Sequence, residues 1–250
     1  METIGIIPAR YASSRLPGKP LADIAGKPMI QWVYERVSQA LKEVYVATDH
    51  EEIKAVVESF GGKAILTGVA HENGTSRCFE ASEILKAQGL AFNAVVNIQG
   101  DEPFINPDTI TLLKETIEQA HVDVATLGSR VKSNEVLFSE SNVFLVKDKN
   151  DKALYFSRTA IPVVRGVAKE QWLEHHTFLK HLGLYAYKVD ALRAYVSLPS
   201  TPLEELEKLE QLRWLEHGKS MHVALVEEEG HSVDTQDDLE TANRLAKKQL

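Results

Sequence analysis

The chain has 250 residues, of which 44% are hydrophobic, and its formal net charge is −8 at pH 7. This length and composition suffice for one α/β domain with a sizeable core, and the acidic balance argues against nonspecific binding to nucleic acid or to anionic membranes. The single cysteine, Cys78, excludes an internal disulfide and predicts a cytoplasmic protein, while no apolar run approaches the ~20 residues of a membrane span.

The first predicted element is a buried strand. The apolar run over residues 4–7 is typical of a central strand, and a strand this close to the N-terminus leaves no room for a signal peptide. Pro8 cannot donate to a strand ladder, so we expect the strand to end there. The next helix is expected to begin near Pro28, because proline is favoured at the first helical position.

Between these elements lies a loop whose cations are Arg10, Arg15 and Lys19. Open α/β sheets hold ligands at the carboxyl ends of their strands, and backbone N–H groups with fixed cations suit a phosphate chain there. A solvated surface loop is the alternative interpretation. A P-loop is excluded, because Gly18-Lys19 is followed by Pro20 and the earlier glycine of that motif is missing.

Three further elements continue the pattern. Apolar residues at helical spacing predict a helix over residues 30–41, and a short strand is expected over 43–47. Asp49, with the glutamate three residues on, predicts a capping box for a helix over 51–60, and a third strand follows at 64–66. A β-α-β-α-β order implies a parallel sheet with right-handed crossovers.

A polar segment over residues 71–77 precedes the next predicted helix. Thr75 is the expected N-cap, and the free N–H groups of the helix start would then face a ligand together with Arg77. An ordinary capped loop without a ligand is the alternative interpretation.

Two aspartates are candidate metal ligands. A buried strand over residues 94–98 is followed by Gln-Gly-Asp-Glu-Pro, which leaves Asp101 at the carboxyl edge of the sheet. Mg²⁺ takes one or two protein carboxylates together with phosphate oxygens. Capping of the next helix is the alternative role for Asp101, but Asn106 lies closer to that helix. Asp234 precedes the expected Thr235 cap and is not needed for it, which makes it the second candidate ligand.

The regular alternation ends after residue 108. A helix over 110–120 and a strand over 122–127 precede a segment of about 130–185, interpreted as a β-rich insertion that carries a substrate site or an oligomer interface. His181 and Tyr185 are four residues apart in an alternating strand and therefore share a face. A structural role is the alternative for this histidine.

Leucines at every third position predict one long amphipathic helix over residues 203–215. Glu210 and Gln211 would be about 100° apart on it, so at most one can lie at the centre of a face. A strand over 221–226 and a terminal helix capped at Thr235 follow. The predicted fold is a doubly wound, mostly parallel Rossmann-like sheet in a single domain with one insertion.

These segments together resemble the CMP-sugar synthetases, and within that class the 3-deoxy-manno-octulosonate (Kdo) cytidylyltransferase family. The resemblance covers essentially the whole chain. Its motifs are Ile-Pro-Ala-Arg-Tyr-Ala-Ser-Ser-Arg-Leu-Pro-Gly-Lys-Pro-Leu at 7–21, Val-Ala-Thr-Asp at 46–49, Asn-Ile-Gln-Gly-Asp-Glu-Pro at 97–103, Ala-Leu-Tyr-Phe-Ser-Arg at 153–158, His-Leu-Gly at 181–183 and Val-Asp-Thr at 233–235.

The resemblance implies a fold of the nucleotide-diphospho-sugar transferase type, a homodimer with the insertion as its interface, and transfer of CMP from CTP to an eight-carbon acidic sugar for lipopolysaccharide biosynthesis. It implies Mg²⁺ as cofactor, and as catalytic residues Arg10, Lys19 and the metal ligands Asp101 and Asp234. The residues implied to bind the nucleotide are Pro8, Ala9, Arg10, Ser13, Arg15, Lys19, Gly74, Thr75, Arg77 and Gln99. Those implied to surround the sugar are Gln99, Arg158, His181, Tyr185, Glu210 and Gln211, with Arg158 as the candidate for its carboxylate.

One motif departs from the family pattern, His-x-Ser-Gly-Thr-(Asp/Glu)-Arg: this chain has Asn73 and Ser76 where the family has the serine and the acidic residue. The departure leaves both Kdo and its 8-amino form open as acceptor, with a sialic-acid-type cytidylyltransferase as a further alternative. A binding module without catalysis is the rival class. The two aspartates argue against it, because a pure binder needs no second carboxylate beside anionic phosphates.

Overall fold

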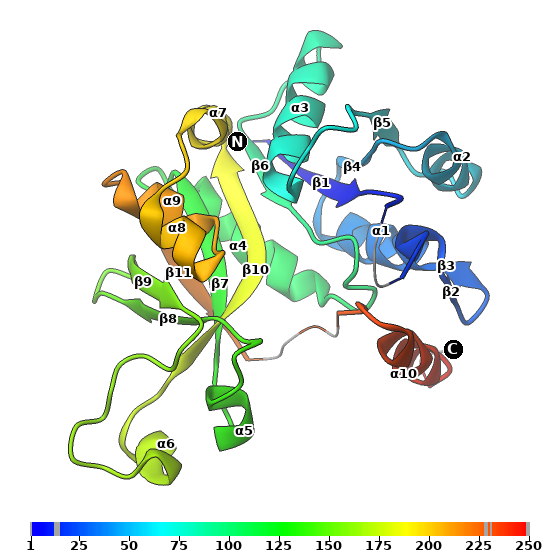
Figure 1. The fold of residues 1–250 in the computed structure, drawn as a ribbon. Helices are drawn as coiled ribbons and strands as arrows, with labels where there is room; N and C mark the ends of the chain where they lie inside the picture. The colour runs from blue at the N-terminus through cyan, green and yellow to red at the C-terminus, as the bar shows by residue number, and fades with distance from the viewer. Residues whose placement is uncertain (1, 13–15, 228–229, 231, 249–250) are drawn as a thin grey trace.

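A nine-stranded sheet forms the centre of the computed structural model, which describes residues 2–12, 16–227, 230 and 232–248 (Figure 1). Its main path has the order β11-β7-β10-β6-β1-β4-β5, and every strand of this path except β10 runs in the same direction. These strands are β1 (Thr3–Ala9), β4 (Val44–Thr48), β5 (Ala64–Leu66), β6 (Ala94–Asn97), β7 (Val124–Arg130), β10 (Leu179–Lys188) and β11 (His222–Val226). The prediction of a mostly parallel α/β sheet is confirmed.

Helices cover both faces of this sheet. One face carries α1 (Met29–Ala40), α2 (Glu51–Ser59) and α4 (Pro107–Glu118), whose apolar sides share a buried cluster with β1. The other face carries α3 (Gly74–Ala87), α7 (Val189–Ser197) and α9 (Gln211–Glu216), which form a second buried cluster. Because each fully buried aliphatic side chain contributes about 1.5–3 kcal/mol, these two cores fix the positions of the strand ends.

The carboxyl ends of β1, β4 and β6 lie at one edge of the sheet. β1 pairs with both neighbours as far as Ile6 and then continues beside β4 only, with Pro8 opposite Ala47. The prediction that the strand stops at Pro8 is wrong, because the proline lies past the last pair with β6 and its missing N–H interrupts no bond to that strand. Ala9 therefore emerges where ligand crevices form in such sheets.

Two helices begin differently from the prediction. Helix α2 follows His50 without a side-chain cap, because the Asp49 carboxylate binds Arg77 instead. Helix α3 is capped by Asn73, whose side-chain oxygen accepts a hydrogen bond from a backbone N–H of the first turn, and not by Thr75. Asn73, one of the two departures from the family pattern, therefore has a local structural role.

Between β7 and β10 the chain forms an arm, residues 131–178, that extends away from the main layers (Figure 1). The arm contains α5 (Asn134–Leu137), β8 (Phe144–Lys147), β9 (Ala153–Ser157), a 3-10 turn (Lys169–Gln171) and α6 (Trp172–His175). β8 pairs with the first residues of β10, and β9 pairs with β8. The arm has a small core of its own, made of Val131, Leu137, Phe144, Trp172 and Phe178. The expected insertion of about 130–185 thus overlaps the arm, and its last residues belong to the central strand β10.

Residues 203–215 form two short helices, so the prediction of one long helix is wrong. Helix α8 (Pro202–Glu207) ends at Lys208, whose φ of 54° and ψ of 45° are left-handed, and α9 begins at Gln211. A left-handed residue ends an α-helix because its φ and ψ are opposite in sign to those of the helix, so the chain leaves the helical path there. Leucines recur at every third position on both sides of this break, so their spacing does not indicate that the helix is interrupted.

The C-terminal helix packs beside the first loop. Helix α10 (Gln236–Ala246) starts with the predicted capping box, formed by Thr235 and Asp238. It packs against the short hairpin of β2 (Asp23–Ile24) and β3 (Lys27–Pro28), which are far away in the sequence (Figure 1). No helix among the described residues is long and apolar enough to cross a membrane.

Candidate active site

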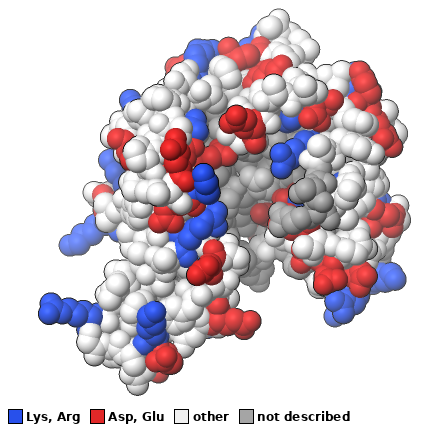
Figure 2. Space-filling view, in the orientation of Figure 1, with Lys and Arg blue, Asp and Glu red and all other residues white. Residues whose placement is uncertain are grey.

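A cleft of about 520 Å³ opens at the carboxyl edge of the sheet, and Figure 2 shows it as a hollow with basic and acidic side chains at its rim. The end of β1 and the start of α3 form one wall, and β10 and the α8–α9 junction form the other. The predicted site residues that line it are Pro8, Ala9, Arg10, Lys19, Gly74, Thr75, Arg77, Gln99, Asp101, Tyr185, Glu210, Gln211 and Asp234. The fold therefore brings most of the predicted site into one cavity.

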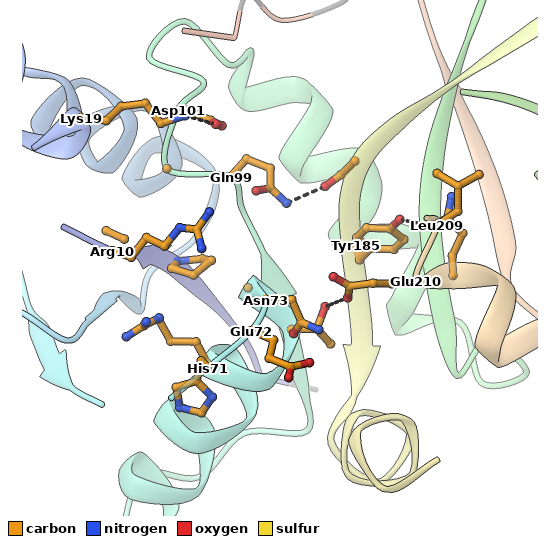
Figure 3. A pocket seen from close by; sticks show the side chains of 18 of the residues that line it. Arg10, Lys19, His71, Glu72, Asn73, Gln99, Asp101, Tyr185, Leu209 and Glu210 are labelled. Atoms are coloured by element: carbon orange, nitrogen blue, oxygen red, sulfur yellow. Dashed lines mark hydrogen bonds and ion pairs between the residues drawn. The ribbon is translucent and has the colours of Figure 1, made fainter. Parts of the chain in front are cut away.

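Asp101, Asp234 and Lys19 meet at one end of this cleft. The Lys19 Nζ lies 2.6 Å from Oδ2 of Asp101 and 3.0 Å from Oδ1 of Asp234, and Figure 3 shows the first of these contacts. The backbone N–H of Val233 donates to the Asp101 carbonyl oxygen at 2.8 Å, which fixes the returning chain beside the end of β6. Two carboxylates that lie far apart in the sequence therefore converge on one cation.

This donor set fits Mg²⁺. The ion needs only one or two protein carboxylates when phosphate oxygens and water complete its octahedron, and the two aspartates already share one positive charge. Within the described parts of the chain, no group of three or more His, Cys, Asp or Glu side chains could hold a metal ion. The site thus suits a cation that arrives together with phosphates.

Arg10 and Lys19 are the described cations of the loop between β1 and α1 that line the cleft. Ser13 and Arg15, which were also predicted to bind phosphate, lie outside the described residues. The 3-10 turn Lys19–Leu21 begins directly after Gly18, whose φ of 65° is left-handed. This conformation is open to glycine at little cost and directs Lys19 toward the aspartates.

Tyr11 attaches this loop to the neighbouring strand. Its ring stacks on that of His50 with centroids 4.0 Å apart, and its backbone N–H donates to the Asp49 carboxylate at 3.4 Å. Its carbonyl oxygen accepts a hydrogen bond from the N–H of Gly18 at 3.3 Å. The loop is therefore held at the end of β4 as well as at the end of β1.

Arg77 lines the cleft, but its charge is already satisfied. The side chain is buried, and the guanidinium donates to the Asp49 carboxylate at 2.9 Å and to the Thr67 hydroxyl at 2.7 Å. Arg77 therefore lies at the cleft as predicted, with its guanidinium engaged by Asp49 and Thr67. Since Asp49 also accepts a hydrogen bond from the Tyr11 N–H, Arg77 is linked through Asp49 to the loop between β1 and α1.

Glycine at position 74 lets the start of α3 approach β1 closely. A Cβ at this position would lie 3.1 Å from Cγ of Pro8, which is tighter than ordinary contacts. The N-terminal turn of α3 therefore lies directly beside the end of β1. Free N–H groups of a helix start favour negative charge, so this turn suits a phosphate or a polar base edge.

The opposite wall is made of buried and half-buried polar side chains. The Tyr185 hydroxyl donates to Oε1 of Gln211 at 3.2 Å, and the Thr75 hydroxyl donates to Glu210 at 3.3 Å (Figure 3). Burial raises the pKa of Glu210 above its ordinary value, and the hydrogen bond from Thr75 opposes this shift. Nε2 of Gln211 is buried without a partner among the described residues, so a donor remains for a ligand. Both Glu210 and Gln211 line the cleft, as the resemblance implied, although the continuous helix on which they were expected is broken before them.

His181 and Arg158 do not line this cleft. Thr126 donates to the Leu184 carbonyl oxygen at 2.8 Å, so its hydroxyl oxygen accepts from Nε2 of His181 at 2.9 Å, and burial lowers the pKa of this histidine to about 3. His181 and Tyr185 share a face as predicted, with ring centroids 5.5 Å apart, but the histidine lines a neighbouring cavity of about 290 Å³. The Arg158 side chain is bonded to the α8–α9 junction instead.

Some cleft residues were not among the predicted contacts, notably His71, Glu72, Tyr187, Tyr195, Lys208 and Leu209. Tyr187 lies two residues after Tyr185 on the same face of the strand, so the alternating pattern of a strand could have predicted it as a cleft residue. Lys208 and Leu209 were not predicted as cleft residues, because one continuous helix was expected over residues 203–215. Tyr195 comes from α7, and nothing in its local sequence indicates that α7 packs beside the cleft.

An open α/β sheet whose crevice combines a cationic loop, a helix N-terminus and a pair of carboxylates defines a nucleotidyltransferase type of site. A family model described as cytidylyltransferase matches residues 4–221, and the chain belongs to this family. It is 49% identical to the 3-deoxy-manno-octulosonate cytidylyltransferase of Phocaeicola vulgatus, over 99% of this chain and 98% of that relative. The enzyme of the same name from Parabacteroides distasonis is 47% identical over 97% of both chains.

Solved structures agree with this assignment. A structure of CMP:2-keto-3-deoxy-manno-octonic acid synthetase complexed with CTP superposes with a TM-score of 0.90 at 40% identity, covering 100% of both chains. A cytidylyltransferase from Leptospira borgpetersenii serovar Hardjo-bovis shares the fold at 15% identity, with a TM-score of 0.62. The fold of this chain is thus that of the sugar-nucleotide synthetases throughout its length.

Proposed function

We propose that this protein transfers CMP from CTP to the anomeric hydroxyl of Kdo, giving CMP-Kdo and pyrophosphate for lipopolysaccharide biosynthesis. The observation that carries the proposal is the two-sided cleft, with Lys19 between Asp101 and Asp234 at one end and the polar residues Tyr185, Glu210 and Gln211 at the other. Relatives that carry the name of this activity match the chain over nearly its full length.

In the proposed reaction the anomeric oxygen forms a bond to the α-phosphorus while the bond to the bridging oxygen of pyrophosphate breaks, and the hydroxyl proton passes to solvent. Arg10 and Lys19 would stabilise the charge that develops on pyrophosphate, an electrostatic role. Gly74, Thr75 and Gln99 would orient the nucleotide, while Glu210 and Gln211 would accept from and donate to sugar hydroxyls. Near-attack alignment of the two substrates is thus the main task of the cleft.

We propose that Asp101 and Asp234 hold Mg²⁺ when CTP is bound. The bound ion would neutralise phosphate charge and increase the acidity of the attacking hydroxyl. Lys19, which pairs with both carboxylates here, would then turn to the phosphates, a movement that its flexible side chain permits.

The test is pyrophosphate release from CTP and Mg²⁺, with Kdo, 8-amino-Kdo and N-acetylneuraminate offered in parallel. Release with Kdo alone supports the proposal. Preference for the 8-amino sugar keeps the mechanism and changes the substrate, and preference for N-acetylneuraminate makes the protein a sialic-acid-type enzyme. Release with none of the three overturns the proposed activity and favours the binding module.

We further propose a cytoplasmic homodimer in which the arm supplies the interface. Large apolar side chains are exposed on the arm, including Leu154 at 61% and Val163 at 71%. Exposed apolar surface of this kind marks association sites in soluble proteins.

A further inference from the structure

The α8–α9 junction is bonded to the end of β9 in the arm. The Ser157 hydroxyl donates to Oε1 of Glu207 at 2.8 Å, and the backbone N–H of Arg158 donates to Oε2 of the same carboxylate at 3.0 Å. The Arg158 Nε donates to the Glu207 carbonyl oxygen at 2.8 Å, and its Nη2 donates to that of Lys208 at 3.4 Å. We call these four hydrogen bonds the Glu207 clamp.

The clamp lies where the helix stops. The last carbonyl groups of an α-helix have no partner within the helix, and the Arg158 guanidinium donates to that of Glu207, the last residue of α8, and to that of Lys208, which follows it. Lys208 is in the left-handed region, which costs an L-residue roughly 1–2 kcal/mol. Charge-assisted hydrogen bonds are about twice as strong as neutral ones, so the clamp can offset this cost.

The break determines which side chains reach the cleft. Leu209, Glu210 and Gln211 follow the left-handed residue directly and all line the cavity, whereas a continuous helix would turn adjacent residues about 100° apart. A partly buried ion pair between Glu204 and Arg213, with Nε 2.7 Å from Oε2, joins α8 to α9. The position of Gln211 is thus set from the outside of the cleft by the arm.

We propose that Arg158 is a positioning residue, which acts through Glu207 and Lys208 to hold Glu210 and Gln211 at the acceptor end of the cleft. This inference rests on the proposed function, since it assigns that end to the sugar. It replaces the expectation that Arg158 binds the sugar carboxylate. The guanidinium is bonded to two backbone carbonyls and does not line the cavity.

The experiment compares Arg158→Ala, Glu207→Ala and the double variant, by pyrophosphate release with separate titrations of Kdo and CTP. We expect either single change to raise KM for Kdo about tenfold or more and KM for CTP less than about twofold. Residues that act as one unit are not additive, so the double variant should be no worse than about twofold beyond the more severe single variant. Arg165→Ala removes an exposed arginine of the same arm and is the matched control, expected to behave as wild type.

A rise in KM for Kdo in Arg158→Ala but not in Glu207→Ala would show direct contact with the sugar and overturn the proposal. Equal effects on both substrates would overturn it too, because a general loss of structure would explain them. Arg158→Lys keeps the charge without the planar fork and covers the case in which alanine prevents folding; it should show a smaller defect of the same kind.

Hydrogen exchange of the free protein separates this inference from the proposed activity. We expect faster amide exchange over residues 202–216 in Arg158→Ala and in Glu207→Ala than in wild type, because the helix ends lose their partners. Unchanged exchange there would contradict the clamp. If wild-type protein released no pyrophosphate with any of the three sugars, the proposed function would be contradicted instead. The exchange result could still be interpreted, because it does not depend on activity.

Discussion

Lys19 holds two carboxylates together that would otherwise repel one another. Its Nζ is within 3.0 Å of both Asp101 and Asp234, and its side chain is 17% exposed. If the two aspartates bind the metal that accompanies CTP, then Asp101→Asn should lower kcat at least about 1,000-fold, because one anionic ligand and its transition-state charge stabilisation are lost. The measurement is pyrophosphate release at saturating CTP and Mg²⁺.

The control for that variant is Asp108→Asn, which changes an exposed aspartate in the first turn of α4 outside the cleft. We expect it to keep wild-type kcat. Circular dichroism should show both variants folded, since Asp234 still pairs with Lys19 after the change. Near wild-type turnover of Asp101→Asn would show that the metal assignment is wrong.

His181 predicts a pH dependence of stability. Burial lowers its pKa to about 3 from an ordinary 6.5, so the folded protein keeps the ring neutral while the unfolded chain takes up a proton below pH 6.5. The stabilising contribution is therefore complete above pH 6.5 and is lost as the pH falls toward 3. Between pH 8 and pH 5 the free energy of unfolding should fall by about 2 kcal/mol from this group.

Urea unfolding of wild type and of His181→Gln at both pH values checks this expectation. Glutamine keeps a donor for Thr126 but does not titrate, so its unfolding free energy should change less with pH. The raised pKa values of Glu102 and Glu210 act in the opposite direction in both proteins and cancel in the comparison. Equal pH slopes for the two proteins would show that His181 is not the group responsible.

At the scale of elements, sequence patterns predicted the order of helices and strands better than the residues at which these begin and end. The buried strand run at residues 94–98 and the caps at Asn106 and Thr235 are local features, and the structure contains them. The Lys208 break depends on groups about fifty residues away, which no local pattern contains. Contacts of the same long-range kind direct Asp49 to Arg77 instead of to the start of α2.

The left-handed conformation of Lys208 gives a stability test for this break. In an ordinary helix, alanine is more stable than glycine by about 1 kcal/mol, but at a left-handed position the order should reverse by about the same amount. Lys208→Gly should therefore have a higher free energy of unfolding than Lys208→Ala, as measured by urea titration. The same pair of changes at Lys54, inside α2, should show the ordinary order. An ordinary order at both positions would contradict the left-handed turn.

At the scale of the whole molecule, the candidate site joins segments that the sequence keeps far apart. The end of β1 and the start of α3 were predictable, because parallel strands place their carboxyl ends at one edge, and Asp234 was a candidate because the Thr235 cap does not need it. The placement of Arg158 outside the cleft was not, because it depends on how the arm meets α8 and α9. Motif similarity indicates that a residue such as Arg158 matters, but it does not tell whether the side chain contacts a ligand or positions other residues of the site.

The arm also predicts how two copies associate. Leu154 and Val163 are large, exposed apolar residues of the arm, which we proposed as the interface of a homodimer. Light scattering should give twice the 27.9 kDa of one chain for wild type. Leu154→Glu and Val163→Glu should give the mass of one chain, because a charge buried in an apolar interface without a partner costs several kcal/mol. Val69→Glu alters a residue that is 80% exposed outside the arm and should leave the dimer intact. A monomeric wild type, or dissociation by Val69→Glu, would contradict the arm as the interface.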